Sequence, residues 1–135
     1  MSKTKIYITY CSAKKDDTLK NSDLEVYPEE LYTSKRIQRF IEKCNEKKVK
    51  WAIFSDLYGI WFPKEKHKWY EKHPNKVTSE EFNKLLADFD LKLKRYNEVW
   101  FYYNPCRFHN LYDRLIKNSS LVIIKFSNEY QIKKD

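Results

Sequence analysis

Residues 50–63 read Lys-Trp-Ala-Ile-Phe-Ser-Asp-Leu-Tyr-Gly-Ile-Trp-Phe-Pro. The first six are mostly apolar and include aromatic and β-branched side chains, so they predict a β-strand over 50–55. The remainder holds Gly59, the only glycine of the chain. A glycine here serves either a turn with a positive φ angle or a close approach of the backbone to a ligand, and the sequence leaves both readings open.

Three other segments, 5–10, 98–103 and 121–126, have the same strand-forming composition. Amphipathic helical patterns separate the four predicted strands. The first helix follows Ser34, a suitable N-cap, and an earlier start with Pro28 in the first helical position is the alternative. Its apolar positions have spacings of three and four residues: Ile37, Phe40, Ile41 and Cys44.

The second helix is predicted from residue 79 to about 96, after a capping box formed by Thr78 and Glu81. The third is predicted to begin with Asn104 as N-cap and Pro105 in its first turn, and to end near Asn118. Residues 64–77 are highly charged and are interpreted as a long irregular excursion.

Strands that alternate with one-faced helices indicate a parallel sheet covered by helices. We therefore expect a single α/β domain over residues 1–135, a three-layer Rossmann-like or flavodoxin-like domain with a four-stranded, mainly parallel sheet. The expected strand order is 2-1-3-4, counted along the chain.

The chain carries a net charge of +8, and such a basic surface attracts polyanions, nucleic acid above all. A lysine-rich surface without a partner is the alternative, since only five of 27 basic residues are arginine. No apolar run is long enough for a membrane span, and the first residues lack the apolar core of a signal peptide, so we expect a cytoplasmic protein without membrane contact. Three widely spaced cysteines indicate reduced thiols.

Open parallel sheets bind ligands beyond the carboxyl ends of their strands. Three segments leave those ends: 11–17, 55–59 and 104–109. Arg107 and His109 are predicted in the first turn of the third helix, whose N-terminus favours anions. The candidate ligand-binding residues on this edge are Cys11, Ser12, Lys14, Lys15, Tyr58, Gly59, Asn104 and Arg107. The candidate catalytic residues are Ser55, Asp56 and His109.

Several common site types do not fit this sequence. One glycine cannot form a dinucleotide or Walker fingerprint, so no cofactor is predicted. Cys106 and His109 have metal-ligand spacing, and Cys11 can approach them, but no second short-spaced pair completes a zinc site, so no metal is predicted. A Cys11–His109 nucleophile pair is an alternative to a buried structural cysteine.

Three short motifs resemble a family of small uncharacterised prokaryotic and phage proteins: Cys11-Ser12-Ala13-Lys14-Lys15, Leu31-Tyr32, and Ser55-Asp56-Leu57-Tyr58-Gly59-Ile60. Family members usually read Leu-Ser-Ala-Lys-Tyr-Gly-Leu at the last motif, so Asp56 and Leu57 depart from the pattern. More loosely, the layout is similar to the uracil-DNA-glycosylase-like domain of archaeal tRNA-guanine transglycosylase relatives. The glycosylase water-activating motif is not visible. The resemblance adds Tyr32 to the candidate ligand-binding residues.

The leading hypothesis is a protein that binds or processes a nucleobase, nucleotide or nucleic acid at this edge, and whether it is an enzyme stays open. One alternative is a non-catalytic, basic nucleic-acid-binding module with residues 64–76 as its arm. The other is a protein-interaction domain that uses exposed aromatic residues: Trp61, Phe62, Trp69 and Tyr70.

Overall fold

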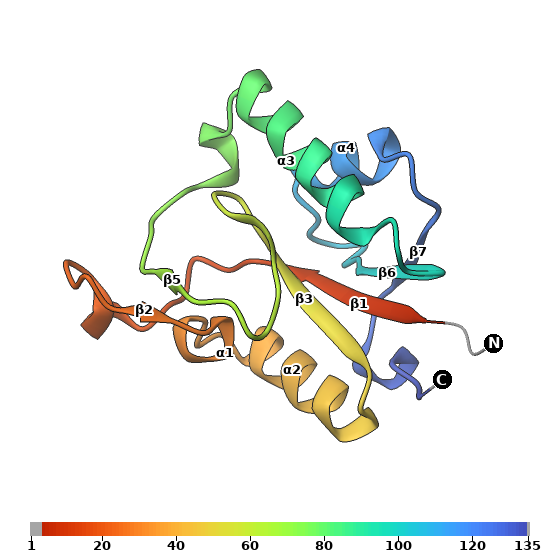
Figure 1. The fold of residues 1–135 in the computed structure, drawn as a ribbon, viewed down its shortest axis with the longest axis horizontal. Coiled ribbons are helices and arrows are strands. Elements are labelled where there is room, and N and C mark those ends of the chain that lie inside the picture. Colours follow the sequence, from red (N-terminus) through yellow and green to blue (C-terminus); the bar gives the residue numbers. More distant parts are fainter. Residues whose placement is uncertain (1–3, 135) are drawn as a thin grey trace.

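The computed structural model describes residues 4–134 and contains a five-stranded sheet in the order β4-β3-β1-β6-β7. Its strands are β1 (Lys5–Tyr10), β3 (Lys50–Ser55), β4 (Gly59–Trp61), β6 (Glu98–Tyr102) and β7 (Ile123–Phe126). All neighbours are parallel except β4, which pairs antiparallel with β3. A separate antiparallel pair, β2 (Glu25–Val26) and β5 (His67–Lys68), lies beyond the carboxyl end of β1 (Figure 1).

The four predicted strands are present in the expected 2-1-3-4 order, but the prediction of a four-stranded sheet is wrong. The fifth strand arises because the chain reverses directly after β3. Gly59 has a φ of +75° and lies opposite Ser55, so Ile60 and Trp61 return along Phe54 and Ile53. Glycine adopts a positive φ angle without the steric cost that a Cβ atom brings, which explains the position of the single glycine.

Residues 4–134 contain four α-helices: α1 (Pro28–Leu31), α2 (Lys35–Lys47), α3 (Ser79–Leu93) and α4 (Asn110–Asn118). Their starts follow local capping chemistry. The Ser34 hydroxyl accepts from the Ile37 amide at 3.3 Å, and the predicted capping box of Thr78 and Glu81 is confirmed in both directions.

The predicted start of the third helix at Asn104 is wrong, because α4 begins only at Asn110. Asn104 caps a local turn instead: its side-chain oxygen accepts from the Cys106 amide at 2.9 Å. The Phe108 ring packs edge-on against Tyr10, Phe101 and Tyr103. These contacts stabilise a loop conformation that helical propensity alone does not indicate.

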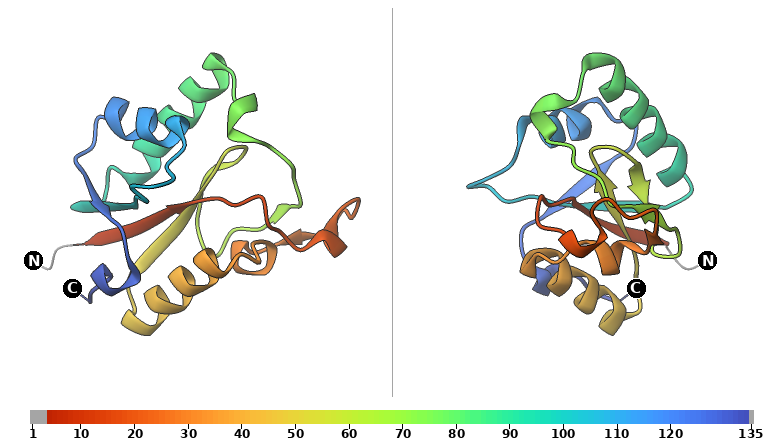
Figure 2. Two further views of the ribbon diagram at one scale, coloured as in Figure 1. Left: turned by 180° about the vertical axis from the view of Figure 1, so that it is seen from behind. Right: turned by 90° about the vertical axis from the view of Figure 1, so that its left-hand side faces the viewer.

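Both faces of the sheet are buried. Side chains alternate along β1 and β3, so Tyr7, Trp51 and Ile53 join one core cluster with α2. Ile6, Ile8, Ala52 and Phe54 join a second cluster with α3 and α4. Figures 1 and 2 show α2 on one side of the strands and the pair α3 and α4 on the other.

Over residues 4–134, no helix combines the length and the apolar character that crossing a membrane requires.

Candidate functional site

A cleft of about 970 Å³ lies at the carboxyl ends of β1 and β3. Its walls come from the segment after β1, from Asp56 after β3, from the loop before α4, and from residues 69–76. The three segments predicted to converge at this edge do so. The fourth wall was not predicted as part of the site. Its aromatic residues, Trp69 and Tyr70, have a charged sequence context without a periodic signal, which predicts only an irregular segment.

The floor of the cleft is a hydrogen-bonded group of buried side chains. The Tyr112 hydroxyl donates to Asp56 Oδ1 at 2.8 Å and lies 3.8 Å from Cys11 Sγ. Asp56 and Cys11 are only 3% and 8% exposed. A carboxyl group is therefore held in a fixed position where it borders both the protein core and the open cleft.

A second hydrogen-bonded group is centred on Tyr70, directly behind the cleft. The Ser55 hydroxyl donates to Tyr70 Oη at 2.9 Å, and the Tyr70 and Tyr32 hydroxyls are 2.5 Å apart. Ser55 Oγ also accepts from the Leu57 and Tyr58 amides. The polar atoms of this group pair with one another, so its role in the structure is to orient the Tyr70 ring.

Lys15 rests on that ring, with Nζ 4.5 Å from the Tyr70 centroid. Backbone pairing sets its direction, because Lys15 forms an antiparallel bridge with Tyr32 and the Asp16 amide donates to Leu31 O at 2.8 Å. Side chains alternate in such an extended segment. Lys15 therefore points inward and is 9% exposed, whereas Lys14 is exposed and lies outside the cleft.

Lys15 forms no ion pair with a carboxylate of residues 4–134. Among the described residues, no carboxylate oxygen lies within 4.0 Å of Lys15 Nζ. Burial lowers the pKa of Lys15, although Cys11 and the more distant carboxyl groups of Asp56, Glu71 and Asp17 act in the opposite direction. Burying a cation without a close partner is costly, so the cleft favours an anion at this position.

Further cations surround the opening. Lys20 lies 5.4 Å from the Trp69 ring, and Lys76 and Arg107 also line the cleft. Lys72 is already paired with Glu81 at 3.0 Å. Two acidic residues share the lining with Asp56, namely Asp17 and Glu71. The positive charges are nevertheless in excess, and the potential at the opening favours anionic ligands.

Burial dominates the protonation of the floor. It raises the pKa of Asp56, although the hydrogen bond from Tyr112 acts in the opposite direction. Burial also raises the pKa of the Cys11 thiol to about 12, with the nearby Asp56 adding to the rise. Cys11 is therefore a protonated thiol and a poor nucleophile. Asp56 can exchange a proton with a bound ligand at a higher pH than an exposed aspartate.

His109 lines the cleft, but its ring nitrogens are both engaged. Nδ1 accepts from the Leu111 amide at 3.0 Å, and Nε2 lies 2.7 Å from Asn75 Oδ1. Since Nδ1 is an acceptor, the proton is on Nε2 and is donated to Asn75. His109 is the N-cap of α4 rather than a residue of its first turn, which corrects the sequence prediction. This geometry does not support a Cys11–His109 nucleophile pair.

The structure separates the other candidate residues into two groups. Cys11, Ser12, Lys15, Asp56, Arg107 and His109 line the cleft. Lys14, Tyr32, Ser55, Tyr58, Gly59 and Asn104 are not part of the lining of this cleft. Ser55 and Tyr32 are fully buried behind the cleft. Tyr58 stacks on His67 at 4.0 Å, and its hydroxyl donates to Lys68 O.

Gly59 also has a steric reason outside the cleft. A Cβ atom at this position would lie 2.3 Å from Asp88 Oδ2. That same oxygen accepts from the Ile60 amide at 2.9 Å, which anchors the start of β4 to α3. The turn interpretation of Gly59 therefore agrees with the structure, and its close neighbour is a side chain of the protein.

Three lining residues were missed because they carry core-like signals in the sequence. Tyr112 belongs to the apolar stripe of a helix, Tyr10 ends a strand, and their rings stack at 4.7 Å. Trp69 is embedded in a charged segment. In the sequence, none of these three residues differs from an ordinary packing residue, and only the tertiary structure places them in the cleft.

Within residues 4–134, no three His, Cys, Asp or Glu side chains are grouped as metal ligands would be. No protein-family model, curated protein sequence or solved structure matches this chain. What the cleft can bind follows from its own chemistry.

Proposed function

We propose that this protein binds a nucleotide in the cleft at the carboxyl edge of its sheet, with the phosphate at Lys15. The observation that carries this proposal is the position of Lys15, a buried cation that borders the cleft and has no carboxylate of residues 4–134 within ion-pair distance. A phosphate supplies the missing charge and accepts hydrogen bonds from the ammonium group.

The aromatic lining supports a nucleobase rather than a simple anion. Trp69 is half-buried beside the cleft, and Lys20 lies near its ring. Bases stack on such indole rings with little dependence on sequence. Lys76 and Arg107, which also line the cleft, provide further positive charge. Together these residues suit a ligand that has a flat ring and a phosphate.

The proposal includes processing of the bound nucleotide as well as binding. Asp56 lies in the same lining as Lys15 and has a raised pKa caused by burial. Such a carboxyl group is suited to accept or donate a proton during a reaction. The sheet order and the helices on both faces support a flavodoxin-like, Rossmann-like classification. The Cys-Ser-x-Lys-Lys motif of the resembling family would then supply Lys15.

The proposal predicts that Lys15→Gln weakens nucleotide binding about 10- to 100-fold, because a charge-assisted hydrogen bond contributes about 1.5–3 kcal/mol. Isothermal titration calorimetry with AMP, GMP, CMP and UMP, and with the four nucleosides, measures the effect. Nucleotides should bind more tightly than nucleosides in the wild-type protein, and this difference should vanish in the variant.

Lys14→Gln is the matched control, since it removes the same charge from an exposed neighbour that lies outside the cleft. It should bind nucleotides like the wild-type protein. Circular dichroism checks that both variants are folded. Equal affinities of Lys15→Gln and the wild-type protein would refute the proposed phosphate position, and the absence of binding by any nucleotide would refute the function.

A further inference from the structure

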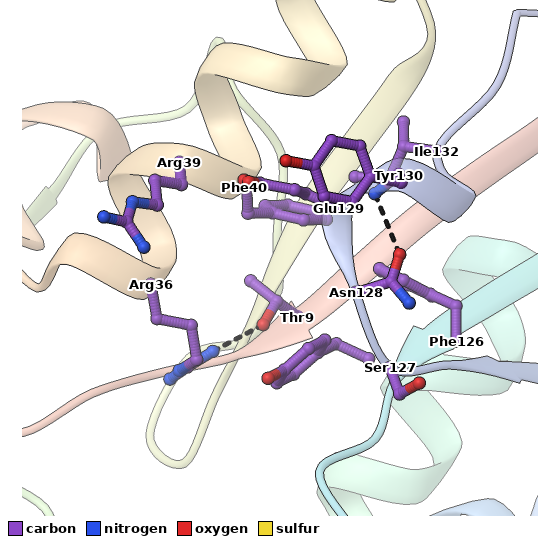
Figure 3. Close-up of a pocket in the computed structure, with 11 residues that line it drawn as sticks. Thr9, Arg36, Arg39, Phe40, Phe126, Ser127, Asn128, Glu129, Tyr130 and Ile132 are labelled. Carbon is purple, nitrogen blue, oxygen red and sulfur yellow. Dashed lines mark hydrogen bonds between the residues drawn. The ribbon is translucent and has the colours of Figure 1, made fainter.

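A second pocket lies beside the cleft, on the α2 face of the sheet. Its volume is about 290 Å³, and it borders the ends of β1, β6 and β7. Figure 3 shows Arg36 and Arg39 of α2 along one side and the segment that follows β7 along the other. Tyr102, Phe40 and Tyr130 contribute aromatic rings. The nucleotide proposed above does not use this pocket.

Arg36 lies between the cleft and the second pocket. Its guanidinium donates to Thr9 Oγ1 at 2.6 Å on the α2 side, and to the Tyr10 and Cys11 carbonyls at 3.1 and 3.2 Å. It also stacks 4.1 Å from the centroid of Tyr10, which lines the main cleft. All three acceptors are uncharged. Within the described residues no carboxylate forms an ion pair with Arg36. Its positive charge can therefore attract an anion bound next to it.

The two sides of the second pocket contribute a cation and an exposed aromatic ring. Arg39 has no carboxylate within ion-pair distance in the described chain, although Glu129 is also part of the lining. Tyr130 is 76% exposed, and Lys43 Nζ lies 5.7 Å from its ring. An exposed tyrosine and an arginine that line one pocket are suited to stack one base and to hold one phosphate.

We propose that this second pocket is a subsite for a further nucleotide of a single-stranded nucleic acid, whose first nucleotide occupies the cleft. Arg36 would contact the phosphodiester between the two. The inference rests on the proposed function, because the cleft must hold a nucleotide for the strand to continue. Single-strand binding proteins combine cations with stacking rings in the same way.

The test compares chain lengths. Fluorescence anisotropy, with competition by unlabelled ligand, gives affinities for the 5′-monophosphates TMP and UMP and for oligo-dT and oligo-U of two, four and six nucleotides. We expect the hexanucleotides to bind at least ten-fold more tightly than the mononucleotides. The comparison of oligo-dT with oligo-U shows whether DNA or RNA is preferred.

Two variants probe the subsite. Tyr130→Ala should weaken hexanucleotide binding at least about five-fold through lost stacking. Arg39→Gln should lower the slope of log K against log salt by about 0.7, as expected for one phosphate contact on a single strand. Both should leave mononucleotide binding unchanged. Arg95→Gln, which removes an arginine stacked on Phe62 and Tyr96 just beyond α3, is the control and should change neither.

The outcomes separate this inference from the proposed function. Mononucleotide binding that is lost in Lys15→Gln, with no gain from chain length, overturns the second subsite and leaves the function intact. Hexanucleotide binding that is insensitive to Lys15→Gln overturns both the nucleotide position and the shared strand. If Arg95→Gln and Arg39→Gln lose the same affinity, the loss is explained by the lower net charge of the protein. That result would also overturn the subsite.

Discussion

At the floor of the cleft, burial and a hydrogen bond act in opposite directions on the pKa of Asp56. Burial favours the neutral carboxylic acid, whereas the hydrogen bond donated by Tyr112 favours the carboxylate. The net effect is a raised pKa, so burial is the stronger influence. The folded protein therefore holds the proton of Asp56 over a pH range in which the unfolded chain has already released it.

This shift predicts a pH-dependent effect of Asp56→Asn on the free energy of unfolding. In the window that starts near pH 4 and extends to the raised pKa of the folded state, the folded wild-type protein binds more protons than the unfolded chain. Its stability therefore falls as the pH rises through this window. Asparagine keeps the acceptor for Tyr112 and does not ionise, so the stability of the variant relative to the wild-type protein should increase with pH.

Urea unfolding at intervals between pH 3.5 and 8 measures this difference. The lowest pH values provide the internal control, since aspartate is mostly protonated there in both the folded and the unfolded chain. A difference that decreases with rising pH would contradict the assignment of a raised pKa to Asp56.

At the scale of the elements, the start of α4 shows how a side chain that was expected to be catalytic serves the fold. His109 has extended backbone angles, and its Nδ1 atom accepts from the Leu111 amide. Helix N-termini leave such amides without a backbone partner. The hydrogen bond between His109 and Asn75 also connects the start of α4 to the wall of the cleft formed by residues 69–76.

His109→Ala should destabilise the protein by about 1 kcal/mol, the usual cost of removing an N-cap acceptor. His109→Asn should retain most of the stability, because asparagine is among the best N-cap residues. Thermal unfolding followed by circular dichroism gives both values. If the asparagine variant loses as much stability as the alanine variant, capping is not the main role of the His109 side chain.

At the scale of the whole molecule, one sheet separates two core clusters that share the same strands. Ile37 of α2 is fully buried in one cluster, and Phe89 of α3 is fully buried in the other. Successive residues of β1 and β3 alternate between the two clusters. Neither cluster can lose its packing without disturbing strands that also support its counterpart.

Ile37→Ala and Phe89→Ala should therefore each lower one common unfolding transition, by about 2–5 and about 3–5 kcal/mol respectively. The tryptophans provide a test on one side, because Trp51, Trp61, Trp69 and Trp100 all lie in or against the α2-side cluster. Phe89→Ala should shift the midpoint of tryptophan fluorescence as much as the midpoint of circular dichroism. Separate midpoints for the two signals would show that the clusters unfold independently.

Much of this architecture was predictable from local patterns. The strands at 5–10 and 50–55 agree with β1 and β3 to the residue, and the four predicted strands have the expected order. The capping residues of α2 and α3 were also correct. These features depend on side-chain periodicity and on hydrogen bonds between residues a few positions apart, which a sequence displays directly.

The composition of the site was only partly predictable. Lys15, Asp56 and Arg107 were expected at the carboxyl edge because the strand order places their loops there. Tyr10 and Tyr112 were not expected there, because burial next to a cleft gives the same sequence signal as burial in a core. The strand β4 was not predicted for a different reason. Its pairing with β3 depends on one positive φ angle at Gly59, which the sequence does not display.

The sequence by itself determined the α/β alternation, the edge at which the loops gather and the excess of positive charge. Only the tertiary structure decided which lysine of the Lys14-Lys15 pair enters the cleft and which pocket lies beside it. The physical reason is that alternation and capping are local, whereas the direction of Lys15 depends on backbone pairing with Tyr32, and the place of Arg36 depends on where α2 crosses the end of β1.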